Sequence, residues 1–182
     1  MDYPGSNMKE KIIKMLEERG NDAAEEAAAI AIENDSLITD LIYMTGADTT
    51  KVRYGAAKVL TTISAKKPEL LYRHIDEIQD MLKDGRTIIK WNVMMQLGNM
   101  AFADKENKIG KEIITYFASL LDNDSMVTAG HGIEGLAKIA EAKPQFRDDI
   151  IDKLAAIENI SRNEECKNIH LGKVFLAFER LY

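Results

Sequence analysis

The apolar residues of the chain recur with the period of an α-helix. Between positions 51 and 65 the apolar side chains fall on one helical stripe: Val52, Ala56, Val59, Leu60 and Ile63. The positions outside this stripe carry polar or aromatic side chains: Lys51, Tyr54, Lys58 and Thr61. Because an α-helix has 3.6 residues per turn, this spacing predicts an amphipathic helix with one buried face and one solvent-facing side.

A second helical stripe follows after a proline. Its apolar residues lie at steps of three or four positions: Leu71, Ile75, Ile78 and Leu82. Pro68 suits the first turn of a helix and disfavours helical geometry in the residue before it, so we expect a new helix to begin there. Asp84-Gly85 favours the end of this helix, because glycine readily adopts the left-handed conformation that follows a helix.

The two helices belong to a repeated unit. Residues 61–78 resemble residues 137–154, so that Lys67-Pro68 matches Lys143-Pro144 at an offset of 76 positions. A copy that starts at Ile89 divides this offset into steps of 37 and 39. A helix-turn-helix unit of about forty residues is typical of an α-solenoid, in which each helical pair packs on its neighbours. The period predicts one domain, 1–182, with five pairs at about 8–33, 36–65, 68–102, 106–142 and 144–181.

The segment from Asp48 to Leu60 resembles the HEAT-repeat signature, in which an aspartate closes one helix and a valine and a basic residue open the next. Val52-Arg53 occupies this place, and Asp84 with Ile89-Lys90 forms a looser copy. The chain is thus similar to the HEAT-repeat (armadillo-like) α-solenoid family. The resemblance implies an all-α fold, a right-handed α-α superhelix of about five helical pairs. It also implies a charge ladder between adjacent repeats, formed by Asp48 and Asp84 with Arg53 and Lys90.

Composition and charge narrow the range of functions. Apolar residues make up 46% of the 182 positions and only three residues are proline, as in a folded helical chain. The formal net charge of −6 weighs against non-specific nucleic-acid binding, which uses a basic surface. Cys166 is the single cysteine, which excludes an intramolecular disulfide. Without a basic-then-apolar leader or a long apolar run, we expect a cytoplasmic protein with no membrane contact.

No catalytic, metal or cofactor site follows from the motifs. Gly130 to Gly135 match the dinucleotide pattern G-x-G-x-x-G, but the repeat places them inside a helix, where small residues let two helices approach closely. His74, His131 and His170 lack the adjacent glutamate that holds iron in deoxyhypusine hydroxylase, an enzyme class of similar architecture. We expect these histidines to be surface or interface residues. We therefore predict a protein that is not an enzyme and that uses no cofactor or metal.

The remaining candidate is the polar side of the second helices. Residues 50–65 and 86–103 hold five basic residues and no acidic residue, within an acidic chain. Tyr54 aligns with Trp91, so two aromatic side chains are expected side by side on adjacent repeats. Aromatic and basic side chains dominate many protein interfaces. The predicted partner-binding residues are Lys51, Tyr54, Lys58, Trp91, Asn92, Met95 and Asn99.

HEAT proteins are mostly scaffolds that hold other macromolecules on a concave wall formed by the second helices. The resemblance therefore implies a non-enzymatic protein-interaction or scaffold module. The basic residues favour an acidic or amphipathic segment of another protein as the partner. Two alternatives stay open at this point: Trp91 packs against a neighbouring helix, or the same surface binds nucleic acid, as in DNA-repair glycosylases of similar architecture.

Overall fold

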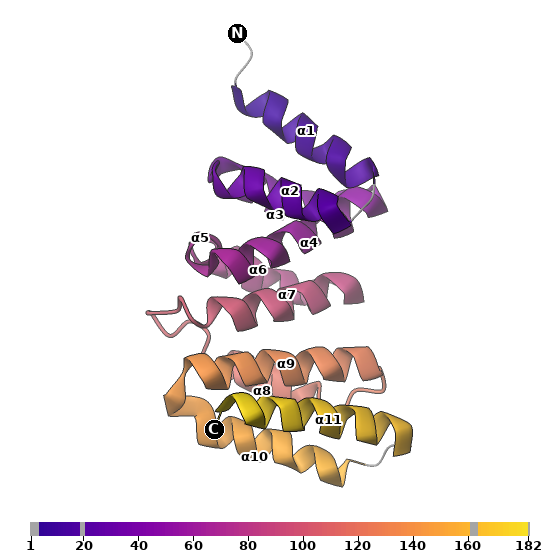
Figure 1. Cartoon of the computed structure of the whole chain (residues 1–182), viewed down its shortest axis with the longest axis vertical. Helices are drawn as coiled ribbons and strands as arrows, with labels where there is room; N and C mark the ends of the chain where they lie inside the picture. The colour runs from indigo at the N-terminus through magenta and orange to yellow at the C-terminus, as the bar shows by residue number, and fades with distance from the viewer. Residues whose placement is uncertain (1–3, 19–20, 161–163, 182) are drawn as a thin grey trace. The chain divides into compact units, whose positions relative to one another are not determined.

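A computed structural model describes residues 4–18, 21–160 and 164–181 of the chain (Figure 1). These described residues form helices and turns and no strand, which confirms the predicted all-α fold. Each of the five predicted ranges matches about two α-helices, except that the first helix of the third pair is interrupted; short 3₁₀ helices accompany the third and fifth pairs. The chain divides into two compact units, Met1–Gln96 and Leu97–Tyr182. That the two units form one domain stays a prediction.

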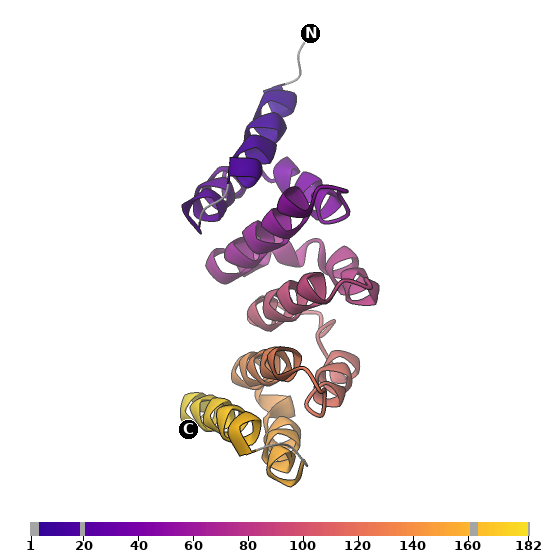
Figure 2. The same ribbon diagram turned by 90° about the vertical axis from the view of Figure 1, so that its right-hand side faces the viewer.

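Unit 1 contains the first three helical pairs. Its elements are α1 (Pro4–Glu18), α2 (Asn21–Ile32), α3 (Ser36–Met44), α4 (Thr50–Lys66), α5 (Pro68–Tyr72), α6 (Ile75–Asp80), the short 3₁₀ helix η1 (Met81–Lys83) and α7 (Thr87–Met100) as far as Gln96. Within this unit α4 and α7 lie in one layer, and α3, α5 and α6 lie in the other (Figure 2). Both α1 and α2 pack against α4, which is the central helix of the unit.

The predicted amphipathic helix is α4. Every residue of its predicted stripe is buried, with exposed fractions from 0% to 6%: Val52, Ala56, Val59, Leu60 and Ile63. Lys51 and Lys58 are exposed on the other side, and Tyr54 and Thr61 are half-buried. The predicted division of this helix into a buried face and an open face is therefore confirmed.

The first helix of the third pair is broken into α5, α6 and η1. The predicted start at Pro68 is correct, but the single helix expected over 68–82 is wrong. The chain leaves helical geometry at His74, where φ is −109° and ψ is 25°, and resumes it at Ile75. The apolar side chains of both pieces still point inward: Leu71, Ile75 and Ile78 are buried.

Unit 2 contains the last two pairs and the end of α7. Its other elements are α8 (Lys111–Ser119), α9 (Met126–Ala142), the 3₁₀ helix η2 (Pro144–Phe146), α10 (Arg147–Ala155), the 3₁₀ helix η3 (Ala156–Asn159) and α11 (Glu164–Leu181). The central helix is α9, which packs against α8, α10 and α11. Within this unit α9 and α11 lie in one layer, with α8 and α10 in the other (Figure 2).

The glycines of the predicted G-x-G-x-x-G segment lie inside α9, which confirms that the segment is helical. A Cβ atom added at Gly132 would lie 3.1 Å from the carbonyl oxygen of Phe117 in α8. A Cβ atom added at Gly98 would lie 3.4 Å from the Cα atom of Gly135. The small residues therefore let α9 approach both α8 and the end of α7, as the sequence predicts.

A buried ion pair holds the loop between α7 and α8. The Lys143 Nζ atom lies 2.8 Å from Asp104 Oδ2, and the two side chains are 3% and 0% exposed. The Asp104 carboxylate also accepts hydrogen bonds from the backbone N–H groups of Lys108 (3.0 Å) and Ile109 (2.7 Å). Asn107, in the left-handed region with φ of 58°, accepts a hydrogen bond from Lys143 at 3.0 Å. This network satisfies charges that would be costly to bury alone.

Candidate partner-binding surface

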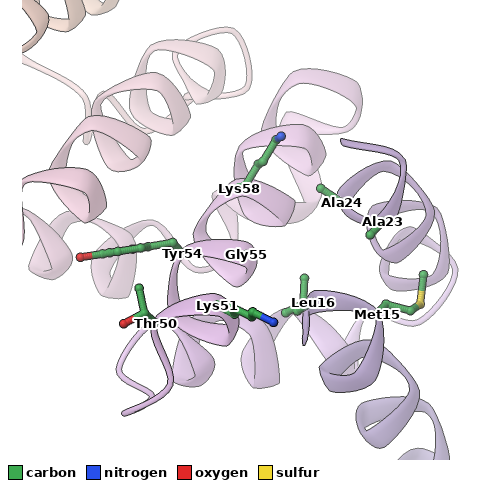
Figure 3. Close-up of a pocket in the computed structure, with 9 residues that line it drawn as sticks. All are labelled: Met15, Leu16, Ala23, Ala24, Thr50, Lys51, Tyr54, Gly55 and Lys58. Atoms are coloured by element: carbon green, nitrogen blue, oxygen red, sulfur yellow. The ribbon is translucent and has the colours of Figure 1, made fainter. Parts of the chain in front are cut away.

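The structure contains an open pocket between α1, α2 and α4 in unit 1, with a volume of about 290 Å³ (Figure 3). We call it the α4 pocket. It is lined by Met15, Leu16, Ala23, Ala24, Thr50, Lys51, Tyr54, Gly55 and Lys58. Three of the predicted partner-binding residues, Lys51, Tyr54 and Lys58, thus line one hollow. Its lining residues on α1 and α2 were not predicted as site residues.

The floor of the α4 pocket is apolar, and the small residues in it leave space for a hollow. Ala23 and Ala24 of α2 lie across from Gly55 of α4, with Leu16 of α1 between them (Figure 3). A Cβ atom added at Gly55 would lie 2.9 Å from Leu16 Cδ2, closer than such atoms approach in proteins. Glycine at position 55 therefore lets Leu16 of α1 pack against the backbone of α4, and a larger residue there would force the Leu16 side chain to move.

The two lysines extend from α4 at the two ends of the pocket (Figure 3). Lys51 donates a hydrogen bond of 2.9 Å to the backbone carbonyl oxygen of Glu17, near the end of α1. A cation is favourable there, since the carbonyl groups at the end of a helix carry partial negative charge. The ring of Tyr54 points away from the pocket, so this side chain borders the hollow without filling it (Figure 3).

The residues of the predicted charge ladder make local contacts. The Arg53 guanidinium donates to the backbone carbonyl of Ala47 at 2.8 Å and lies 5.0 Å from the ring centre of Tyr54. Arg86 donates through Nε to Asp84 Oδ1 at 2.8 Å, and this hydrogen bond lowers the pKa of the Asp84 carboxyl group. Asp48 and Asp84 line a second hollow together with Arg86. None of these hydrogen bonds joins adjacent repeats, and the ladder that includes Lys90 stays a prediction.

The predicted partner residues on α7 are only half open to solvent. Trp91, Asn92 and Met95 are half-buried. Asn92 accepts a hydrogen bond of 3.0 Å from the Thr61 hydroxyl group, which in turn accepts one of 3.1 Å from Gln96 Nε2. Polar contacts therefore connect α4 to α7 within unit 1, and part of the Asn92 amide is already engaged.

Asn99 lies in unit 2 and is nearly buried, with 9% of its surface exposed. Its side-chain oxygen accepts a hydrogen bond of 2.6 Å from Lys138 of α9. It therefore offers a partner little surface, although it is one of the predicted partner-binding residues. Sequence reasoning missed Lys138, although the offset of 39 positions that relates Leu97 to Leu136 also relates Asn99 to Lys138.

Charged side chains connect α9 to α11 in the same unit. Arg180 lies 3.1 Å from Glu134 Oε1, and Lys138 lies 4.0 Å from the same oxygen atom. Burial lowers the pKa of Lys138, Glu134 opposes this shift, and Arg180 adds to it. Burial also lowers the pKa of His131, and the nearby Lys173 ammonium group lowers it further. Three cationic side chains, Arg180, Lys138 and Lys173, therefore lie near Glu134 and His131 on the polar side of α9 and α11.

The histidines have different environments. His170 is fully buried, and its Nε2 atom lies 3.0 Å from the carbonyl oxygen of Met126, at the interface of α11 and α9. His74 lies 3.8 Å from Glu77, and His131 is half-buried. Among the described residues, no three histidine, cysteine or acidic side chains are grouped so that they could hold a metal ion.

No helix in the described part of the chain is long and apolar enough to cross a membrane.

Comparison with known proteins identifies the fold. No protein-family model matches the sequence, and no curated protein matches it. A designed armadillo repeat protein in complex with the peptide (KR)4 is similar, with 16% identity, a TM-score of 0.60, and coverage of 94% of this chain and 80% of that chain. A crystal structure of computationally designed armadillo repeat proteins for modular peptide recognition gives 16% identity, a TM-score of 0.57, and coverage of 94% and 81%.

These similarities show that the chain has an armadillo/HEAT-like repeat fold, which confirms the predicted repeat architecture. At 16% identity they show the fold alone. Function therefore has to be argued from the surface of this chain.

Proposed function

We propose that the chain is a non-enzymatic protein-interaction module that binds an acidic or amphipathic segment of another protein on the open side of α4 in unit 1. The observation that carries this proposal is that Lys51, Tyr54 and Lys58 line one pocket with an apolar floor. An apolar hollow with a few polar groups at its edge is the usual form of a recognition site.

The distribution of charge supports an acidic partner. The segment 50–65 of α4 carries three basic residues and no acidic one, in a chain whose formal net charge is −6. Opposite charge on a partner steers the encounter and fixes orientation, while apolar contacts supply most of the affinity. A scaffold role and a cytoplasmic location are part of the same proposal.

Fluorescence anisotropy with three labelled probes tests the proposal: a glutamate-rich peptide that contains several leucines, the peptide (KR)4, and a single-stranded oligothymidylate. We expect the acidic peptide to bind. The double variant Lys51→Gln/Lys58→Gln should weaken this binding about fivefold or more at low salt, because two favourable charges are lost. The control Lys67→Gln removes an exposed lysine just beyond the end of α4 and should leave the affinity unchanged.

The other probes define the opposite outcomes. Preference for (KR)4 would show that the acidic partner is wrong. Binding of the oligonucleotide that falls steeply with added salt would favour the nucleic-acid alternative. Failure of every peptide to bind would overturn the interaction module on this surface.

A further inference from the structure

We propose that the α4 pocket holds one apolar side chain of the partner segment, with an acidic residue of that segment on each side of it. This inference rests on the proposed function and makes it specific: the ligand is an extended peptide in which two carboxylates lie about three positions apart, with a leucine-sized or similar side chain between them.

The size of the pocket supports a single side chain. Its volume of about 290 Å³ lies at or below the lower end of the range, roughly 300–1,000 Å³, of pockets that enclose small molecules and cofactors. The side chains of Met15, Leu16, Ala23 and Ala24 form an apolar floor without a charged group. Such a floor favours an aliphatic or aromatic group, because the burial of apolar surface is favourable and an unpaired polar group there is costly.

The hollow is a consequence of particular small residues. Gly55 lets Leu16 pack close to the backbone of α4. Ala23 and Ala24 line the pocket from α2, and their short side chains leave the space open. A larger side chain at position 23 would project into the space, because Ala23 is half-buried at its border (Figure 3). Filling the pocket from this position leaves the buried stripe of α4 unchanged.

The spacing of the lysines sets the spacing of the acidic residues. Lys51 and Lys58 lie seven positions apart on α4, which is about 10 Å along a helix at about 1.5 Å per residue. A peptide in the extended polyproline II conformation covers about the same distance in three residues at about 3.1 Å each. Because this conformation has about three residues per turn, the side chains at positions i and i+3 lie on the same side of the peptide. Peptides of the form Glu-Leu-x-Glu or Glu-x-Leu-Glu therefore place a carboxylate near each ammonium group and the leucine over the floor.

The test compares short labelled peptides that carry Glu-x-Leu-Glu in a glycine-serine background. Replacement of the leucine by serine should lower the affinity about tenfold or more, because the burial of the leucine side chain on the apolar floor is lost. Replacement of both glutamates by glutamine should lower the affinity about fivefold and remove its dependence on salt.

Protein variants locate the binding. Ala23→Leu fills the α4 pocket and should lower the affinity for the leucine peptide about tenfold. Ala29→Leu, the matched control, adds the same side chain to an exposed position of α2 outside the pocket and should leave the affinity within about twofold. Far-UV circular dichroism of both variants shows whether each remains folded.

The outcomes separate this inference from the proposed function. If the serine peptide binds as well as the leucine peptide, or if Ala23→Leu binds normally, the apolar anchor in this pocket is wrong while an acidic-peptide module stands. If octanoate displaces the peptide at equal concentration, the pocket selects a small amphipathic anion and the peptide assignment is overturned. If neither the short peptides nor the longer acidic peptide binds, the proposed function itself fails.

Discussion

Lys143 keeps its ammonium group inside unit 2, although the same Lys-Pro sequence leaves Lys67 exposed in unit 1. The difference lies in what covers each lysine. Asp104 and Asn107 of the loop after α7 bind Lys143 through their side-chain oxygen atoms. A buried pair of this kind stabilises little relative to an apolar pair, but the loss of one partner leaves a charge buried and unpaired.

We therefore expect Lys143→Met to lower the free energy of unfolding by about 3 kcal/mol or more. The matched control is Lys67→Met, which removes an exposed lysine from the same position of the repeat and should change stability by less than about 0.5 kcal/mol. Urea denaturation followed by circular dichroism measures both values. Equal effects of the two changes would show that the buried pair contributes nothing.

His131 makes stability depend on pH. Burial and Lys173 lower its pKa in the folded protein, so the unfolded chain binds a proton first as the pH falls. Stability is therefore complete above the ordinary pKa of histidine, about 6.5, and declines as the pH falls below that value toward the lowered one. His131→Gln should remove this part of the decline below about pH 6.5.

Histidine NMR titration checks the cause directly. The His131 ring should titrate below its ordinary pKa, and Lys173→Met should move the titration upward because one positive neighbour is lost. A His131 pKa at or above the ordinary value would contradict this account.

Sequence periodicity predicted which side chains of α4 are buried, because burial on a single helix follows from spacing alone. It could not distinguish Lys143 from Lys67, or place Tyr54 beside the pocket rather than in it. These features depend on loops and helices from other repeats, such as Asp104 over Lys143. Asn99 is the clearest case: its own position in α7 suggests an exposed polar side chain, and contact with Lys138 covers it.

At the scale of a helix, a glycine has opposite effects in α9 and α11. Gly132 lies against the carbonyl oxygen of Phe117, whereas a Cβ atom added at the exposed Gly172 has no atom of the described residues within 4 Å apart from its chain neighbours and the nearby backbone of α11. Glycine weakens a helix because the unfolded chain gains freedom from it. In α9 this cost is offset, because the missing side chain allows close packing against α8. In α11 nothing in the packing of the described residues offsets it.

Gly172→Ala should therefore raise the free energy of unfolding by about 0.5–1 kcal/mol. Gly132→Ala should lower it by about 1–3 kcal/mol, because the added methyl group overpacks the contact between α8 and α9. Thermal or urea denaturation of the two variants, side by side, gives the comparison. Stabilisation by Gly132→Ala would show that α9 can move away from α8 at little cost.

Helix boundaries were predictable only where a residue type enforces them. Pro68 begins α5 as expected, since proline fixes the backbone angle of a first turn. The interruption at His74 had no such marker, and the apolar period passes through it unchanged. The apolar period shows which face of a helix is buried. It does not reveal a local break after which the apolar residues still face the same side.

At the scale of the whole chain, we propose that the two units unfold together as one domain. The helix α7 contributes residues to both units, and neighbouring repeats in such proteins are stabilised by their shared interfaces. Trp91, the one tryptophan, lies in unit 1. Its fluorescence therefore reports on unit 1, while far-UV circular dichroism reports on all helices.

In the Lys143→Met variant, which weakens unit 2, both signals should shift to the same lower urea concentration. A circular dichroism transition that precedes the Trp91 transition would show that unit 2 unfolds separately and that the single-domain prediction is wrong.

The enclosed position of Lys143 also has a chemical consequence. An acylating reagent modifies a lysine only when the amine is uncharged and accessible to the reagent. The exposed Lys67 should therefore react quickly in the native protein. We expect Lys143 to react only when the loop from Ala101 to Gly110 opens, because Asp104 and Asn107 of this loop bind its ammonium group. The ratio of the two modification rates, measured by mass spectrometry, therefore reports how often the loop over Lys143 opens.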